Sequence, residues 1–407
     1  MMKENSLLER PFHEHLYNGL LYIILFFLIW GESSFYSVNA LSGTNRLIVC
    51  GIIIFLSLLL IKTINKLRFV LVCFIIGWVL LMDCVLSPNA LKQTLIIIIE
   101  MLTGIFVASL IDKRDFVRKF TNIILFFAIY SLVIFALTYF IPDFIYSFPI
   151  IISRNGHSYY NLFFSVVTDN DYVIRNYGLF WEPGAFSVFL CIALYLELFA
   201  KEKIRFFRVF VLSLTILSTK STLGILAFVL LYLIFFVYAP SKKVRWLSLL
   251  VVVTLGTVIL LVFSKSVFGE VFDKLFKKDN FGNTNSSLQI RYDAVVYILK
   301  EFFKSFTVGI GIEKFMKVQE EYCSNMATAT MVNWLAIYGL IWGAAMIFGY
   351  IKFFIARKSK LIKTLLVIVF TCFLISTENF LMNPFIYTLV FYGLTGRGID
   401  ETSFSDH

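Results

Sequence analysis

The stretch R-N-Y-G-L-F-W-E-P-G-A-F, residues 175–186, places a cation and a carboxylate directly before a long apolar run. Pro183 follows Glu182, and proline is favoured at the first position of a helix. The first N–H groups of such a helix have no intrahelical partner, so they favour a carboxylate or a bound phosphate beside them. With Arg175 on the water side, these residue types predict a site for an anionic substrate at the rim of a membrane.

A structural alternative is that Glu182 is only a helix-end charge that offsets the free N–H groups. Ionisable groups are costly near hydrocarbon, however, and where they occur there they usually have a function. Both interpretations of Glu182 stay open at this point.

The composition is typical of a polytopic membrane protein, because 59% of the 407 residues are hydrophobic and only 15% are charged. Of the six cysteines, only Cys323 falls in a long loop, and no metal-ligand spacing occurs, so neither a disulfide framework nor a metal site is expected. The N-terminal apolar run lacks a small-residue cleavage site and is expected to be a retained helix.

Apolar runs long enough to cross a bilayer predict an all-α fold with about 12 transmembrane helices. The whole chain, 1–407, is expected to form one transmembrane domain. The expected spans are 16–33, 47–61, 69–86, 93–111, 120–141, 178–200, 206–218, 222–239, 246–263, 329–351, 363–378 and 380–395.

Lysine and arginine predict the orientation of these spans. They crowd into the connections 62–68, 113–119, 201–208, 242–245 and 352–363, whereas the short connections on the other side hold only Arg46, Lys92 and Lys220. Positive charge collects on the cytoplasmic side, so both termini are expected there. The net charge of +10 is thereby explained without nucleic-acid binding.

Two long connections, 142–177 and 264–328, fall on the outer side and are expected to be functional. The second contains an amphipathic helical pattern from Ser286 to Phe306, in which Arg291 shares a face with apolar residues. Arg291 would therefore be held away from bulk water, or would merely extend to lipid headgroups.

Forked guanidinium groups are suited to a pyrophosphate, and a carboxylate beside them could act as a general base toward a sugar hydroxyl. The expected catalytic residues are Glu182 and Arg291. The expected pyrophosphate-binding residues are Arg175, Arg291, Lys220 and Arg154, and Glu378 is a further polar residue of the outer face. The sugar-binding candidates are Tyr177, Trp181, Tyr160 and His157, with an interfacial aromatic belt as the alternative.

The segment 175–186 resembles the R-x-x-G-x-F-x-E-P-G pattern of Wzy-type O-antigen and capsule polymerases. L-S-T-K-S-T-L-G (217–224) is similar to an S-R-containing hairpin of the wider polymerase and ligase group, with Lys220 where arginine is usual. S-L-Q-I-R-Y-D-A to V-G-I-G-I-E-K-F (287–315) resembles its second-loop segment, and T-E-N-F-L-M-N-P-F (377–385) resembles polymerase C-termini.

This resemblance implies a GT-C-like glycosyltransferase in the bacterial inner membrane that needs no metal ion or other cofactor. It would join undecaprenyl-pyrophosphate-linked oligosaccharide repeat units into O-antigen or capsular polysaccharide, with release of the lipid pyrophosphate. The implied partners are the lipid-linked donor and acceptor, membrane lipids and a chain-length regulator.

Two alternatives remain. An O-antigen ligase would use the same donor, but its histidine-asparagine pair is absent, since an ungapped count back from Gly339 reaches Thr328 and Ala329. A polysaccharide or lipid transporter would be expected to carry interior charges on several helices and pairs of broken helices.

Overall fold

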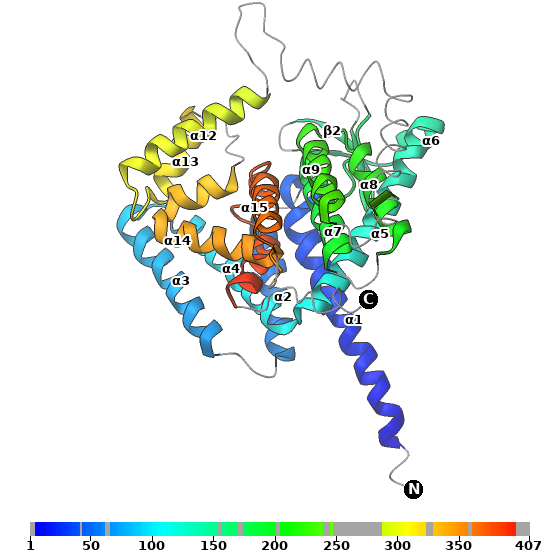
Figure 1. Ribbon diagram of the computed structural model, residues 1–407, viewed down its shortest axis with the longest axis horizontal. Coiled ribbons are helices and arrows are strands. Elements are labelled where there is room, and N and C mark those ends of the chain that lie inside the picture. The colour runs from blue at the N-terminus through cyan, green and yellow to red at the C-terminus, as the bar shows by residue number, and fades with distance from the viewer. Residues whose placement is uncertain are drawn as a thin grey trace, which may run out of the picture.

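The computed structural model describes residues 5–40, 43–61, 66–153, 156–168, 174–200, 204–238, 245–246, 287–322, 329–356 and 360–395. The candidate Arg154 therefore lies outside the described residues, and only residue 246 of the expected span 246–263 lies within them. The described part is mostly helical (Figure 1). Its helices are α1 (Asn5–Ser33), the π-helix η1 (Tyr36–Ala40), α2 (Gly43–Leu60), α3 (Lys66–Leu86), α4 (Leu91–Leu110), α5 (Lys113–Phe140), α6 (Pro142–Tyr146), α7 (Pro183–Phe199), α8 (Phe206–Ser218), α9 (Thr222–Tyr238), α12 (Ser287–Lys304), α13 (Gly311–Tyr322), α14 (Thr330–Phe354), α15 (Leu361–Ile375) and α16 (Pro384–Leu394).

Four helical segments are long and apolar enough to cross a membrane: Glu14–Gly31, Leu91–Leu110, Lys113–Phe140 and Thr330–Phe354. Apolar segments of 10–17 residues lie in α2 (Arg46–Leu60), α3 (Val70–Leu86), α7, α8, α9, α15 and α16, and these are shorter than the usual span of about 20 residues. The protein is thus a helical membrane protein by length and composition, and the expectation of about 12 spans goes beyond these four.

Helix α7 is buried along almost its whole length. Nearly all its side chains are buried, from Ala185 through Leu198, and it packs against α5, α8 and α9. A helix that is apolar on every side is stable only when it is surrounded. The start of α7 is therefore a fixed position on which a site can be built.

A small antiparallel sheet in the first long connection was not expected from the sequence. Its order is β1 (Ile150–Ile152), β2 (Ser158–Leu162) and β3 (Ser165–Thr168). Successive strand residues point to opposite faces. Tyr160 accordingly packs with Ile134 of α5 and Ile145 of α6, whereas Tyr159 packs with Phe35 on the other face.

Helix α14 is interrupted at Gly339, whose φ of 79° and ψ of −179° are not helical. The backbone groups released by this break bind the turn that follows α12: Ile310 N donates to Ala336 O at 2.8 Å, and Leu340 N donates to Phe306 O at 3.0 Å. In an apolar surrounding, a broken helix needs such replacement partners. The break therefore fixes α12 to α14.

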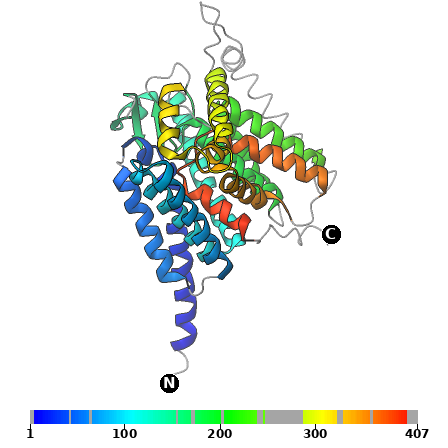
Figure 2. The same cartoon turned by 90° about the vertical axis from the view of Figure 1, so that its left-hand side faces the viewer.

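The sheet and the hairpin of α12 and α13 both lie toward the end of the molecule opposite the N-terminus (Figures 1 and 2). The beginning of α7 and the loop between α15 and α16 meet there, as the contacts below show.

Candidate functional site

The segment before α7 is held by Asn176. Its side-chain amide donates to Ser131 Oγ of α5 at 3.1 Å and to Ser218 Oγ of α8 at 2.9 Å, and its Oδ1 accepts from Gly178 N at 2.9 Å. A buried amide with several satisfied hydrogen bonds fixes a loop firmly. The backbone that carries Arg175 is therefore fixed beside α8.

Gly178 and Phe180 turn the chain into α7. Gly178 has a φ of +53°, and a Cβ there would overlap the ring of Phe186. Phe180 stacks on Phe186 with ring centroids 5.0 Å apart, and Ser34 pairs with Phe180 in an isolated β-bridge. Glu182 then takes an extended conformation as the N-cap residue and Pro183 begins the helix, as the sequence predicts.

A second carboxyl comes from the loop between α15 and α16. Thr330 at the start of α14 donates its hydroxyl to Glu378 O at 2.7 Å and accepts from Phe380 N at 2.8 Å. Farther along this loop, Arg46 donates to Met382 O at 3.2 Å and pairs with the buried Glu100 at 3.3 Å. The loop between α15 and α16 is thus held by Thr330 at Glu378 and Phe380 and by Arg46 at Met382.

Glu378 lies directly on the first turn of α7. The residue is 5% exposed, and a Cβ at residue 184 would overlap its Oε1. Only glycine at position 184 allows the carboxyl to approach so closely. The edge of Trp181 also contacts the Phe380 ring, with centroids 6.0 Å apart, so the two segments pack together.

Arg291 on α12 completes the cluster. Its Nη1 donates to Thr377 O, and its Nη2 lies 3.9 Å from Glu378 Oε1. The face that the sequence assigns to Arg291 also carries Ile298 and Phe302, which are 1% and 3% exposed. Since α12 packs on α14, this face is covered by protein and not by lipid alone.

Arg175 approaches from the other side. Its Nη2 donates to Lys220 O at 3.4 Å, at the turn between α8 and α9. Lys220 has a φ of +51°, and its ammonium group donates to Tyr139 Oη at 3.1 Å. The backbone of Lys220 thus positions Arg175, while its side chain contacts Tyr139.

The two carboxyls and two guanidinium groups influence one another. Desolvation raises the pKa of Glu182, although its side chain keeps contact with solvent, and the charges of Arg291 and Arg175 oppose this rise. Burial and the neighbouring Glu182 raise the pKa of Glu378 to about 8, again against the two arginines.

Several sequence-predicted residues lie apart from this cluster. Tyr177 and Tyr160 are only 6% and 8% exposed, because they fill the apolar layers on the two faces of the sheet. His157 is exposed beside the turn between β1 and β2. Of the four sugar-binding candidates, Trp181 alone is adjacent in sequence to a cluster residue.

Glu378 joins the cluster although its sequence context distinguishes it only weakly. It belongs to the polar residues expected at the outer face, and an acid shortly before the N-P of a helix start resembles the arrangement at Glu182. Its catalytic potential depends on contacts with α7 and α12 that no local pattern predicts.

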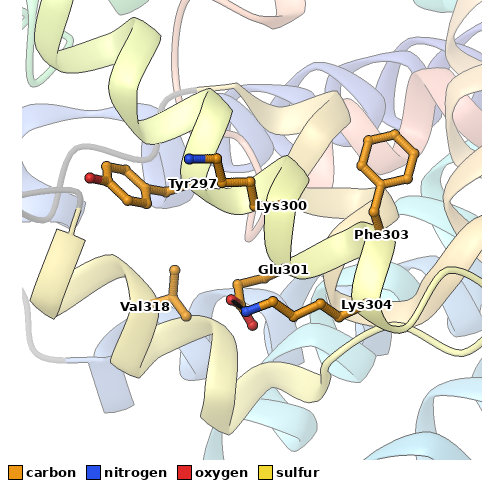
Figure 3. A pocket seen from close by; sticks show the side chains of 6 residues that line it. All are labelled: Tyr297, Lys300, Glu301, Phe303, Lys304 and Val318. Atoms are coloured by element: carbon orange, nitrogen blue, oxygen red, sulfur yellow. Dashed lines mark hydrogen bonds and ion pairs between the residues drawn. The ribbon is translucent and has the colours of Figure 1, made fainter.

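A separate cavity of about 520 Å³ lies between α12 and α13 (Figure 3). It is lined by Tyr297, Lys300, Glu301, Phe303, Lys304 and Val318. None of these belongs to the cluster, and Glu301 is already paired with Lys304 and with Lys314. The chemistry of the cavity is therefore less specific than that of the cluster.

Among the described residues, no group of three or more histidine, cysteine, aspartate or glutamate side chains could hold a metal ion. No model of a known protein family matches this chain, and no curated protein sequence matches it.

Proposed function

We propose that the cluster of Glu182, Glu378, Arg175 and Arg291 is the active site of a polymerase that joins lipid-pyrophosphate-linked oligosaccharide repeat units. The observation that carries this proposal is the convergence of two arginines and two carboxyls from three distant segments at the first turn of α7. The sequence resemblance to Wzy-type polymerases supports the same activity.

The arginines suit a pyrophosphate. The buried Nε of Arg175 has no hydrogen-bond partner among the described residues, and a buried donor without a partner is costly. A phosphate oxygen would satisfy this donor, and a second guanidinium from Arg291 would stabilise the charge that develops as the lipid pyrophosphate departs.

Glu182 is the residue that would accept a proton. The residue is exposed, so an acceptor sugar hydroxyl can approach it, and its raised pKa makes it a stronger base than an ordinary carboxylate. The hydroxyl would lose its proton to Glu182 as it attacks the donor sugar. The bond between that sugar and the pyrophosphate breaks in the same step.

The test is the Glu182→Gln variant in cells that depend on this protein for surface glycan. Positioned proton transfer contributes roughly 10²- to 10⁴-fold to a rate. We expect single lipid-linked repeats to accumulate without extension, while the variant reaches the membrane at the normal level. Glu14→Gln, an exposed change on α1, is the matched control. A full ladder of long chains from Glu182→Gln would remove Glu182 from the mechanism.

A transporter is the second candidate, since two observations favour it. Helix α14 is interrupted at Gly339, and charged pairs such as Arg46 with Glu100 lie inside the bundle. Purified protein with a lipid-linked repeat unit separates the two activities. A polymerase releases lipid pyrophosphate and forms a two-repeat product, whereas a transporter leaves the substrate chemically unchanged.

A further inference from the structure

Glu378 occupies the place that an anionic ligand would need. Its Oε1 lies on Gly184 at the start of α7 and 3.9 Å from Arg291 Nη2. An ionised carboxyl there competes with a phosphate for the guanidinium and repels it at short range. Binding an anion at Arg291 therefore requires Glu378 either to move away or to lose its charge.

The structure argues against movement. Arg291 binds Thr377 O, and Thr330 binds both Glu378 O and Phe380 N. The backbone on both sides of Glu378 is thus fixed to α12 and α14. Its side chain is almost fully buried between α7 and α12, so a large rotation would need the surrounding helices to separate.

We propose that a pyrophosphate binds at Arg291 only when the Glu378 carboxyl is protonated, so that binding to the ionised form takes up one proton, which makes Arg291 available to the ligand. This inference rests on the proposed function, because it takes the pyrophosphate of the lipid-linked substrate as the anion. The proton comes from solvent on binding and returns to solvent when the lipid pyrophosphate leaves.

The charged and titratable groups that face Glu378 are consistent with this coupling. Arg291 comes from α12, and Glu182 and Arg175 come from the segment before α7; Thr330 of α14, which donates to the backbone oxygen of Glu378, is neutral. Burial and the charge of Glu182 raise the pKa of Glu378 to about 8. A bound pyrophosphate adds further negative charge and raises this pKa again.

The experiment uses the full chain in lipid nanodiscs and farnesyl pyrophosphate, a short isoprenoid pyrophosphate, as the probe. Calorimetry in two buffers of different ionisation enthalpy measures the protons taken up on binding. We expect about one proton at about pH 9 and almost none at about pH 6.5. The dissociation constant should be about tenfold weaker at pH 9 than at pH 7, because only the neutral form of Glu378 binds well.

Two variants test which carboxyl takes up the proton. In Glu378→Gln the uptake at pH 9 should disappear and the affinity should stay near the neutral-pH value, whereas Glu182→Gln should retain the uptake. Binding by the wild-type protein without proton uptake at pH 9, or uptake that persists in Glu378→Gln, would overturn the inference and leave the polymerase proposal intact. Absence of probe binding at every pH would overturn the pyrophosphate site itself. If Glu378→Gln does not fold, the two-buffer measurement on the wild-type protein still decides.

Discussion

Glu378 lies so close to Gly184 that no side chain fits at position 184 without displacing the carboxyl. The two residues belong to the loop before α16 and to the first turn of α7. Because Glu182 immediately precedes that turn, the contact connects the loop that carries Glu378 with the segment that carries Glu182. It therefore defines the centre of the candidate site.

Gly184→Ala should remove this contact. The new methyl group would overlap Glu378 Oε1, and because the loop of Glu378 is clamped, the first turn of α7 and Glu182 before it should shift, so polymer formation should fall sharply while the protein remains folded. Activity is measured beside a melting curve in detergent. Gly77→Ala is the control, because nothing lies within 4 Å of a Cβ at that position of α3. Equal activity of the two variants would show that the close approach of Glu378 to Gly184 does not matter.

Arg291→Lys should lose activity although the charge is retained. A lysine cannot bind Thr377 O and a phosphate with two forked nitrogens at once. Charged hydrogen bonds are worth about 1.5–3 kcal/mol, so we expect a loss of about 10- to 100-fold in polymer formation. The measurement is the glycan ladder at matched protein level, with Lys300→Arg on the exposed side of α12 as the control. Normal chain length in Arg291→Lys would indicate that Arg291 only anchors the helix.

Glu378 should make stability depend on pH in a particular direction. Its folded-state pKa of about 8 lies above the ordinary value of 4.5, so folding opposes its ionisation. Its contribution to stability is full below pH 4.5 and is lost as pH rises through 8, by up to about 1.4 kcal/mol per pH unit. Melting temperatures of the wild type and Glu378→Gln, compared from low to high pH, isolate this component. A constant difference between the two proteins would contradict it.

Gly339→Ala should destabilise the whole hairpin of α12 and α13. Gly339 has a φ of 79°, and a Cβ there would overlap Thr307 O in the turn that binds the broken helix. The backbone strain alone is worth about 1–3 kcal/mol, and the overlap adds to it. We expect a lower membrane yield and a lower melting temperature. Gly51→Ala on α2, where a Cβ has open space, should leave both unchanged.

The predicted orientation is tested by labelling single cysteines in intact spheroplasts, after the native cysteines have been replaced. His157→Cys is exposed in the connection expected outside, and Glu14→Cys is exposed near the N-terminus expected inside. A membrane-impermeant maleimide should label position 157 and spare position 14. The reverse pattern would place the cluster on the cytoplasmic side and exclude polymerisation at the outer face.

The amino-acid sequence by itself determined the features that depend on local pattern. The excess of apolar residues indicates a helical membrane protein, and E-P-G predicts the start of α7 at Pro183. The helical spacing from Ser286 to Phe306 predicts a helix close to the observed Ser287–Lys304, with Arg291 on its apolar face. Each of these follows from neighbours within a few turns of the chain.

The tertiary structure alone decided which polar groups meet. Glu378 reaches Gly184 because Thr330 clamps its loop and Arg46 holds Met382, and neither contact leaves a periodic signal in the sequence. The same limit applies to Tyr177, since an aromatic residue in an interfacial belt and one inside a small sheet look alike until the sheet is seen. Local chemistry selects the residue types, whereas the distance between segments depends on packing across the whole bundle.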